Sequence, residues 1–397
     1  SNGTWTQQQK IQASDAQAID YFGSTVSLSP DGNTALIGAH REDTGVSNAG
    51  AAYIFTRSNG TWTQQQKIQA SDAQAIDYFG STVSLSPDGN TALIGAHRED
   101  TGVSNAGAAY IFTRSNGTWT QQQKIQASDK QAYDYFGHSV SLSSDGNTAL
   151  VGAIGEDSSS GAAYVFTRSG GTWTQQQKIK ASDAQYGDYF GYSVSLSSDG
   201  NTALVGAYRE DTVGSDDGAA YVFTRSGGTW TQQQKIQASD AEANDNFGYS
   251  VSISSDGNTA LVGARLEDTG DFDAGAAYVF TRSNGTWTQQ QKIQASDSEA
   301  YDYFGYSVSL SPDGNTALIG AYFEDTGGSS AGAAYIFTST SIPGSETVLY
   351  VDTTINRVGI NRTTPAYTLD VAGDLACSGT MRHRAFAFYA RASGGQI

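Results

Sequence analysis

Short stretches in which apolar and polar side chains alternate recur along this chain of 397 residues. Residues 21–29 alternate, which is typical of a strand with one buried face. Asp31-Gly32 then predicts a tight hairpin turn, because this dipeptide tolerates positive φ, and residues 34–39 form an apolar run. Residues 51–57 and 4–12 supply two further strand patterns. Each unit therefore predicts four short antiparallel strands, and no stretch has a helical period.

The strand pattern belongs to a sequence repeat. Residues 1–57 and 58–114 are identical, and four edited copies follow. The repeat is marked by Trp5, Trp62, Trp119, Trp173, Trp230 and Trp287, spaced 57, 57, 54, 57 and 57 residues apart. Each unit of a repeat protein packs against its neighbours. A β-solenoid has shorter rungs, so the pattern favours an all-β, six-bladed β-propeller of four-stranded antiparallel blades.

The phase of the repeat predicts how the ring closes. The last repeat ends at Thr338, one strand short of a full blade. We expect the strand around Trp5 to complete the blade that begins at Phe304, which would leave no unpaired sheet edge. A seventh blade requires a further repeat before residue 1.

Charge narrows the range of partners. The chain has a net charge of −18; residues 339–397 hold five arginines and four acids, which leaves 17 basic and 36 acidic residues, or −19, in the repeats. Such a field repels nucleic acid and anionic membranes, and no apolar run is long enough for membrane insertion.

The single Cys377 excludes a disulfide framework. Asn-x-Thr sequons, which suit either glycosylation or a tight turn, occur at Asn2, Asn59, Asn116, Asn284 and Asn361.

Two short motifs recur in every repeat. Each copy carries a Phe-Gly pair, at Phe22, Phe79, Phe136, Phe190, Phe247 and Phe304. Each also carries a Gly-Ala pair, beginning at Gly38, Gly95, Gly152, Gly206, Gly263 and Gly320. With the Asp-Gly turn and the Gly-Ala-Ala-Tyr-Ile/Val-Phe strand, the unit resembles the FG-GAP repeat, the blade of the integrin α-subunit propeller. The resemblance implies a propeller domain over residues 1–338.

The calcium loops of integrin blades have Asp at alternate positions, and this chain departs from that pattern. Its nearest match is Asp271-Phe272-Asp273. Together with Glu267 and Asp268, these carboxylates are the candidate Ca²⁺ ligands, since calcium prefers oxygen donors.

A second resemblance covers the C-terminal part. Arg357-Val358-Gly359-Ile360-Asn361, followed by Thr364-Pro365 and residues 369–375, resembles a segment common in phage and large-virus tail fibres. It implies a linker over residues 339–348 and a stem over 349–381 that forms a homotrimer. The alternating residues 382–397 indicate the start of a further β-domain.

Edits between the copies concentrate in the loops that join strands two and three and in those that lead to the next blade. In antiparallel blades these loops lie on one face. Binding residues commonly lie on loops held by a rigid scaffold, while exposed loops also tolerate drift. The candidate binding residues are Tyr133, Tyr186, Tyr208, Arg209, Arg265, Phe272, Tyr301, Tyr322 and Phe323.

Two acidic series occur in every blade, whatever its loops contain: six Glu-Asp pairs such as Glu42-Asp43, and the Asp20 series before each Phe-Gly. This constancy favours structural hydrogen bonds and ion pairs over cation sites. His40, His97 and His138 show no metal-ligand spacing, and no nucleophile motif or phosphate loop is present. The sequence therefore predicts no catalysis.

These features predict an exposed structural or adhesion protein, located outside the cell or on a virion. Its propeller would bind a host-surface glycan or protein, and its stem would contact other virion or surface proteins. A purely architectural spacer without a ligand is the alternative, and a hydrolase with its active site in the channel is a third.

Overall fold

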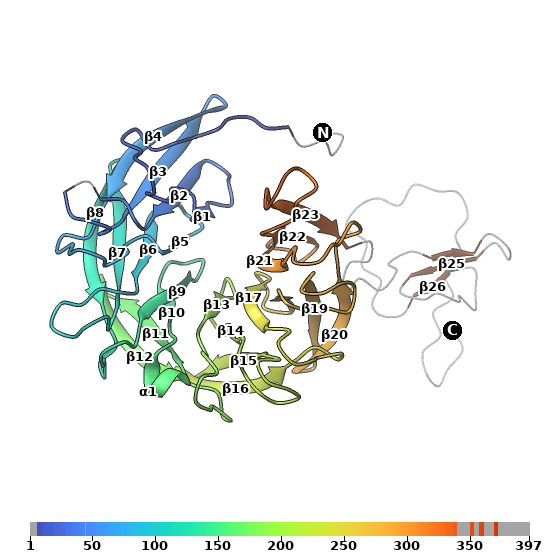
Figure 1. Ribbon diagram of the computed structural model, residues 1–397. Helices are drawn as coiled ribbons and strands as arrows, with labels where there is room; N and C mark the ends of the chain where they lie inside the picture. Colours follow the sequence, from blue (N-terminus) through green and yellow to red (C-terminus); the bar gives the residue numbers. More distant parts are fainter. Residues whose placement is uncertain (1–5, 44, 340–349, 353–356, 361–368, 372–397) are drawn as a thin grey trace, which may run out of the picture. The chain divides into compact units, whose positions relative to one another are not determined.

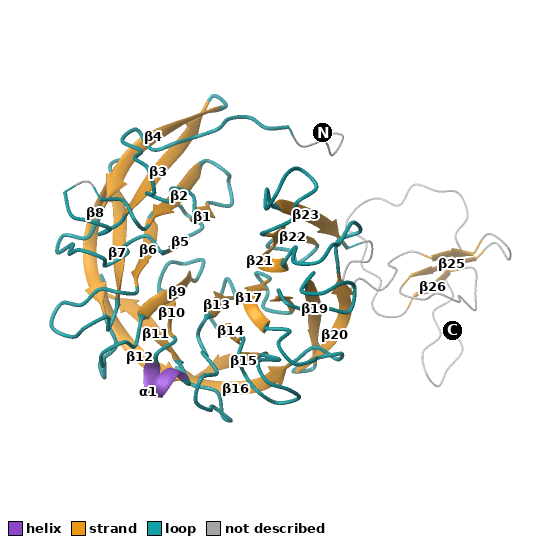
Figure 2. Cartoon of the chain, in the orientation of Figure 1, coloured by secondary structure: helices purple, strands orange, loops and turns teal. Residues whose placement is uncertain are grey.

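A computed structural model describes the chain except residues 1–5, 44, 340–349, 353–356, 361–368 and 372–397. The chain divides into two compact units, Ser1–Thr338 and Ser339–Ile397. The first is an all-β propeller of six blades, as predicted, with the blades following one another around a centre (Figure 1). Figure 2 shows how little helix it holds. None of the helices among the described residues has the length and apolarity that a membrane crossing needs.

The strands of the blades follow sequence order. Blade one contains β1 (Thr25–Leu28), β2 (Thr34–Ala39), β3 (Ala51–Ser58) and β4 (Thr61–Ile68), and blade two contains β5 (Thr82–Leu85), β6 (Thr91–Ala96), β7 (Ala108–Ser115) and β8 (Thr118–Ile125). Blade three contains β9 (Phe136–Leu142), β10 (Thr148–Ala153), β11 (Ala162–Ser169) and β12 (Thr172–Ile179), and blade four contains β13 (Ser193–Leu196), β14 (Thr202–Ala207), β15 (Ala219–Ser226) and β16 (Thr229–Ile236). Blade five contains β17 (Phe247–Ile253), β18 (Thr259–Ala264), β19 (Ala276–Ser283) and β20 (Thr286–Ile293), and blade six contains β21 (Phe304–Leu310), β22 (Thr316–Ala321) and β23 (Ala333–Thr338).

Each blade is an antiparallel meander from an inner to an outer strand (Figure 1). The hairpin between β3 and β4 pairs Ser58 with Thr61 and turns at Asn59 and Gly60. Both turn residues have positive φ, 49° and 81°, as a two-residue turn that matches the strand twist requires.

The hydrophobic core lies between successive blades. Leu36, Ile54 and Ile68 of blade one pack with Phe79 and Val83 of blade two in one buried cluster. The same arrangement recurs at the following interfaces. Each blade therefore has two apolar faces, one for each neighbour.

Glycine pairs set the spacing of the blades and explain the two recurring motifs. A Cβ on Gly38 would lie 2.1 Å from the carbonyl oxygen of Gly80, in the next blade. Gly80, from the Phe-Gly pair, has a φ of 86°, and its Cβ would lie 2.3 Å from the carbonyl oxygen of Ala51. Only glycine fits such backbone contacts.

The prediction that the repeats contain no helix is wrong at one place. A helical turn, α1 (Glu156–Ser159), follows β10 in blade three. This blade has the 54-residue repeat, so its loop is three residues shorter. The chain turns back through Asp157 and Ser158, whose φ values are 50° and 60°.

Blade six is three-stranded in the described part of the chain, where β23 pairs with β22 alone. Residues 6–12 form no strand there, so the expected completion of this blade is not formed; Trp5 lies outside the described residues. Instead, the Gln9 side chain donates to the Trp62 carbonyl at 3.0 Å and accepts from its N–H at 2.8 Å. Gln66 holds Trp119 in the same way. Residues 6–12 thus lie beside the outer strand of blade one.

The second unit holds a three-stranded sheet of β24 (Tyr350–Asp352), β25 (Arg357–Ile360) and β26 (Leu369–Val371). The pairing of β24 with β25 is antiparallel and that of β25 with β26 is parallel. Most of the predicted linker, stem and further β-domain lies outside the described residues.

Candidate binding surface on the loop face

The edited loops lie side by side. We call the loop face the surface formed by the loops between the second and third strands and the loops leading into each inner strand. At the first junction, Gly50 forms a bridge with Phe79 and the Tyr78 N–H donates to the Asn48 carbonyl at 3.3 Å. Equivalent bridges occur at the next four junctions. The edited loops therefore lie on one face of the propeller, as strand geometry predicted.

A partly buried ion cluster beneath the loop fixes its base in blades one to five. In blade two, the Lys124 ammonium lies 2.7 Å from both Glu99 and Asp72. The Tyr110 hydroxyl donates to Asp72 at 2.9 Å, and the Glu99 side chain is only 1% exposed. The glutamates of the Glu-Asp pairs thus have a structural role, as their constancy indicated. The same lysine–glutamate pair joins Lys67 and Glu42, Lys178 and Glu156, Lys235 and Glu210, and Lys292 and Glu267.

The second acidic series caps the loop before each Phe-Gly. Asp77 is buried and accepts a hydrogen bond from the Gln74 N–H at 2.7 Å. Burial raises the pKa of Asp77 to about 7, and the charges of Glu99 and Asp100 add to this shift. Burial likewise raises the pKa of Asp245 to about 7. These aspartates also have a structural role.

Two positions per blade meet where the inner strand begins and the second strand ends, and we call them rim pairs. They are Ser24 and His40, Ser81 and His97, His138 and Ile154, Tyr192 and Tyr208, Tyr249 and Arg265, and Tyr306 and Tyr322. Their residue types divide the ring: blades one to three carry serine, histidine and isoleucine, and blades four to six carry tyrosine and arginine.

The first half of the rim holds serine–histidine contacts. Ser81 Oγ and His97 Nδ1 share a hydrogen bond of 3.0 Å, as do Ser24 and His40 at 3.1 Å. Burial, and then the charge of nearby His138, lowers the pKa of His97 to about 3. Its imidazole is therefore neutral at physiological pH and a weak general base, because proton transfer is most efficient when the pKa is near the operating pH.

The second half of the rim is a continuous series of aromatic rings. Ring centroids lie 4.8 Å apart for Tyr192 and Tyr249, and 5.1 Å apart for Tyr249 and Tyr306. Tyr306 stacks on Tyr322 at 4.7 Å, and Tyr322 contacts Phe323 at 4.7 Å. Tyr322 is 54% exposed and Phe323 39%. We call these residues, with Tyr208, which lies 4.5 Å from Tyr192, the aromatic arc.

The candidate binding residues separate into groups. Tyr208, Tyr322 and Phe323 belong to the aromatic arc, and Arg265 lies over the ring of Tyr249 at 4.2 Å. Arg209 lies over the Tyr208 ring at 5.5 Å.

The remaining candidates lie elsewhere in the loops. Phe272 and Tyr301 form an edge-to-face pair at 5.3 Å. Tyr133 contacts Tyr135 at 6.3 Å, and Tyr186 is 85% exposed.

Sequence reasoning missed Tyr192, Tyr249 and Tyr306. These tyrosines lie just before or near the start of the inner strands, whose sequences otherwise hardly vary between the copies. They are therefore not among the edited loop positions. Their signal was the replacement of Ser24 and Ser81 by tyrosine at the same repeat position.

Two of the four predicted calcium ligands have other contacts. Glu267 is buried and lies 2.6 Å from the Lys292 ammonium, while Asp271 accepts from the Phe272 N–H at 2.8 Å. Among the described residues, no cluster of three or more His, Cys, Asp or Glu side chains is placed to hold a metal ion. A calcium site at Glu267, Asp268, Asp271 and Asp273 stays a prediction.

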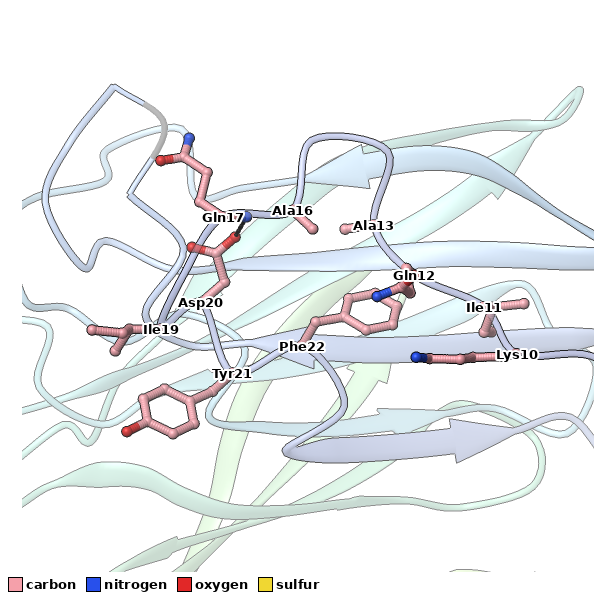
Figure 3. Close-up of a pocket in the computed structure, with 10 residues that line it drawn as sticks. All are labelled: Lys10, Ile11, Gln12, Ala13, Ala16, Gln17, Ile19, Asp20, Tyr21 and Phe22. Carbon is pink, nitrogen blue, oxygen red and sulfur yellow. Dashed lines mark hydrogen bonds between the residues drawn. The ribbon is translucent and has the colours of Figure 1, made fainter.

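A pocket lies at the free side of blade one (Figure 3). It is lined by Lys10, Ile11, Asp20 and Phe22, among others, and inside it the Gln17 N–H donates to Asp20 Oδ2 at 2.6 Å. It contains none of the candidate binding residues.

The repeats match a known sequence family over almost the whole propeller. The FG-GAP repeat matches residues 5–55, 62–112, 119–166, 173–223, 230–280 and 287–337. The chain belongs to the FG-GAP repeat family. No curated protein matches it.

Solved structures share the fold of this FG-GAP protein at low identity. The periplasmic gluconolactonase PpgL of Pseudomonas aeruginosa is 18% identical, with a TM-score of 0.53 over 80% of this chain and 81% of that one. A putative 6-phosphogluconolactonase from Bacteroides uniformis is 14% identical, with a TM-score of 0.54 over 80% and 85%. Hydrazine synthase of Kuenenia stuttgartiensis is 17% identical, with a TM-score of 0.51 over 79% and 78%.

These neighbours correct the prediction that the chain has no catalytic activity. That prediction rested on the lack of a catalytic motif, and it is wrong as an exclusion, because propellers of this size include proteins named as lactonases. A fold does not determine activity. The FG-GAP resemblance is confirmed, whereas none of the comparisons supports the tail-fibre resemblance, the viral origin or the adhesive role.

Proposed function

We propose that the propeller is a recognition module that binds carbohydrate through the aromatic arc. The observation that carries this proposal is the arc itself: contacting, partly exposed tyrosine rings continue from one rim pair to the next only in blades four to six, whereas the rings at the rim pairs of blades one to three are imidazoles. The rim of the first two blades, whose sequences are identical, has serine and histidine instead. If the fold itself required tyrosine rings at these positions, every blade would have them.

The chemistry of the arc suits sugars. Tyrosine offers a broad apolar ring and a hydroxyl, and it loses little conformational entropy on binding. Sugar rings have apolar faces and many hydroxyl groups, so rings such as Tyr322 and Phe323 can stack while tyrosine hydroxyls form hydrogen bonds. A rigid propeller holds these side chains in place without a ligand, which lowers the cost of ordering them.

The wider setting follows from the same proposal and from the stem resemblance. We place the module on a virion or at a cell surface, with a host glycan or glycoprotein as ligand. Residues 349–381 join three copies and contact neighbouring surface proteins. Sedimentation of the full chain against a chain ending at Thr338 tests this: a trimer and a monomer are expected, and two monomers would refute the stem.

A glycan array probed with the full chain tests the binding. The variant with Tyr322→Ala and Phe323→Ala should lose at least about tenfold in affinity, as for an aromatic anchor. Ile76→Ala is the matched control, because Ile76 is 47% exposed on the same face outside the arc. Equal binding by both variants, or no glycan bound by the parent chain, would refute the proposal and leave the architectural spacer.

The same preparation should be tested for catalysis. Solved structures of this fold include a gluconolactonase, so hydrolysis of gluconolactone is the direct assay. Turnover that disappears in the Tyr322 and Phe323 double variant would replace recognition by catalysis as the function of this surface.

A further inference from the structure

Arg265 is the one rim-pair residue with a permanent positive charge. At the same repeat position the other blades have His40, His97, Ile154, Tyr208 and Tyr322. The residue is partly buried, within the aromatic arc. The fold therefore accepts an imidazole, an isoleucine or a tyrosine here, so folding alone does not explain an arginine.

The guanidinium of Arg265 is held by rings. It lies 4.2 Å from the ring centroid of Tyr249 and 5.6 Å from that of Tyr303. Its Nε donates to Asn246 Oδ1 at 3.3 Å. Such stacking fixes the plane of the guanidinium while its N–H edge remains able to donate.

Within the described residues no carboxylate lies within 4.0 Å of Arg265, and the charge of Asp273 acts on it only from a greater distance. By contrast, the five partly buried lysines of the ion clusters each lie within 3 Å of a glutamate, and Arg209 approaches Asp216 at 4.0 Å. A partly buried cation without a direct ion pair is uncommon in a unit of charge −19, because buried charges are usually paired.

The charge of Arg265 reaches the hydroxyls of the arc. Burial raises the pKa of Tyr192 to about 12, and Arg265 opposes this shift. It acts in the same direction on Tyr208, Tyr249 and Tyr306. The hydroxyls of Tyr192, Tyr249 and Tyr306 hydrogen-bond to one another, so the cation over the Tyr249 ring lies beside a series of linked hydroxyl groups.

We propose that Arg265 binds an anionic substituent of the carbohydrate, a carboxylate or a sulfate ester, while the sugar ring stacks on the arc. Arginine binds both oxyanions with paired N–H donors. One local cation within an acidic surface selects a ligand with an isolated negative charge and repels polyanions. This inference rests on the proposed carbohydrate binding and adds the class of sugar.

Three oligosaccharides with one backbone provide the test: a neutral form, a form with a uronic carboxylate, and a sulfated form. Calorimetry should show that the parent chain prefers an acidic form, and the two acidic forms identify which oxyanion it is. Arg265→Tyr installs the residue of blades four and six. It should weaken acidic binding about 10- to 100-fold, the range for a hydrogen bond to a charged group, and change neutral binding less than about twofold.

Two further variants separate the alternatives. Arg98→Leu installs the residue of blade five at the same repeat position, outside the arc, and removes one positive charge; it should change acidic binding less than about threefold. Arg265→Lys should retain part of the acidic preference, since it keeps the charge without the paired donors. Melting temperature and circular dichroism establish that each variant is folded.

Each outcome has one meaning. Equal losses with Arg98→Leu and Arg265→Tyr would overturn the inference, because overall charge would explain the preference. Tight neutral binding that depends on Tyr322 and Phe323, with no acidic preference, would also overturn it and leave the proposed function standing. No binding of any form would refute the proposed function itself.

Discussion

Residues 1–57 and residues 58–114 have the same sequence and different surroundings. Val26 is 67% exposed and its counterpart Val83 is 8% exposed. Leu28 and Leu85 differ in the same way, at 57% and 7%. Because the sequences are identical, the difference comes entirely from the neighbouring blade. In this protein these residues are buried only where a neighbouring blade covers them.

The source of the difference lies at the two ends of the propeller. Val83 and Leu85 pack against Leu36 and Ile54 of the preceding blade. The surface of blade six that corresponds to this partner is free: Leu318 is 45% exposed and Ile336 is 53% exposed. Blades one and six thus each expose one of their two apolar faces, and matched substitutions in the two identical copies measure what a junction contributes.

The largest effect is expected at the phenylalanine of the Phe-Gly pair. Phe79 is fully buried, so Phe79→Ala should lower the free energy of unfolding by about 4 kcal/mol, as for a buried aromatic ring. Phe22 contacts the rings of its own blade at similar distances but is only half-buried, so Phe22→Ala should cost about 2 kcal/mol. Urea denaturation of both variants measures the difference. A larger loss for Phe22→Ala would contradict the comparison.

The ion cluster provides the next contrast. Lys124→Met leaves Glu99 buried without its cation and should cost about 3 kcal/mol, as when one partner of a buried pair is removed. Lys10 occupies the same repeat position and forms no ion pair among the described residues, so Lys10→Met should cost less than about 0.5 kcal/mol. Thermal unfolding of the two variants shows the contrast. Similar losses would mean that Lys10 joins Asp297 and Glu324 of blade six in solution.

Aliphatic truncation should give a smaller difference. Leu85→Ala removes a buried side chain and should cost about 2 kcal/mol, whereas Leu28→Ala should cost about 0.5 kcal/mol. Denaturation midpoints are sufficient for this comparison. If both variants lose about 2 kcal/mol, blade one has a neighbour on this side in solution.

The smallest effect concerns pH. The pKa of Asp77 is raised in the folded state to about 7, while the unfolded value is near 3.9. The folded chain therefore binds more protons between these values, and the stability that Asp77 contributes falls as the pH rises from about 4 to 7. Asp77→Asn should remove a fall on the order of 1 kcal/mol between pH 6 and pH 7. Parallel stability curves for parent and variant would show that Asp77 does not titrate there.

The sequence predicted the parts of the fold that depend on local pattern. Alternation and Asp-Gly turns located the strands of each blade, and strand geometry placed the edited loops on one face. The contact of Lys124 with Glu99 escaped prediction because it joins residues that are far apart in the repeat and are brought together only by the meander. The helical turn at Asp157 follows from a three-residue deletion, and the path of the shortened loop depends on the three-dimensional packing around it. The arc was found in part, since Tyr192 lies outside the edited loops.

The glycine contacts between blades have a consequence for how this protein evolves. Gly38 and Gly80 join neighbouring units through backbone atoms, and these glycines occur in every copy. A duplicated unit therefore finds a compatible surface on whichever unit it follows, without compensating mutations in either. The gene can lengthen by copying a 57-residue segment in frame, and each new copy can then acquire its own rim residues, as Arg265 and Tyr322 illustrate, at no cost to the junctions.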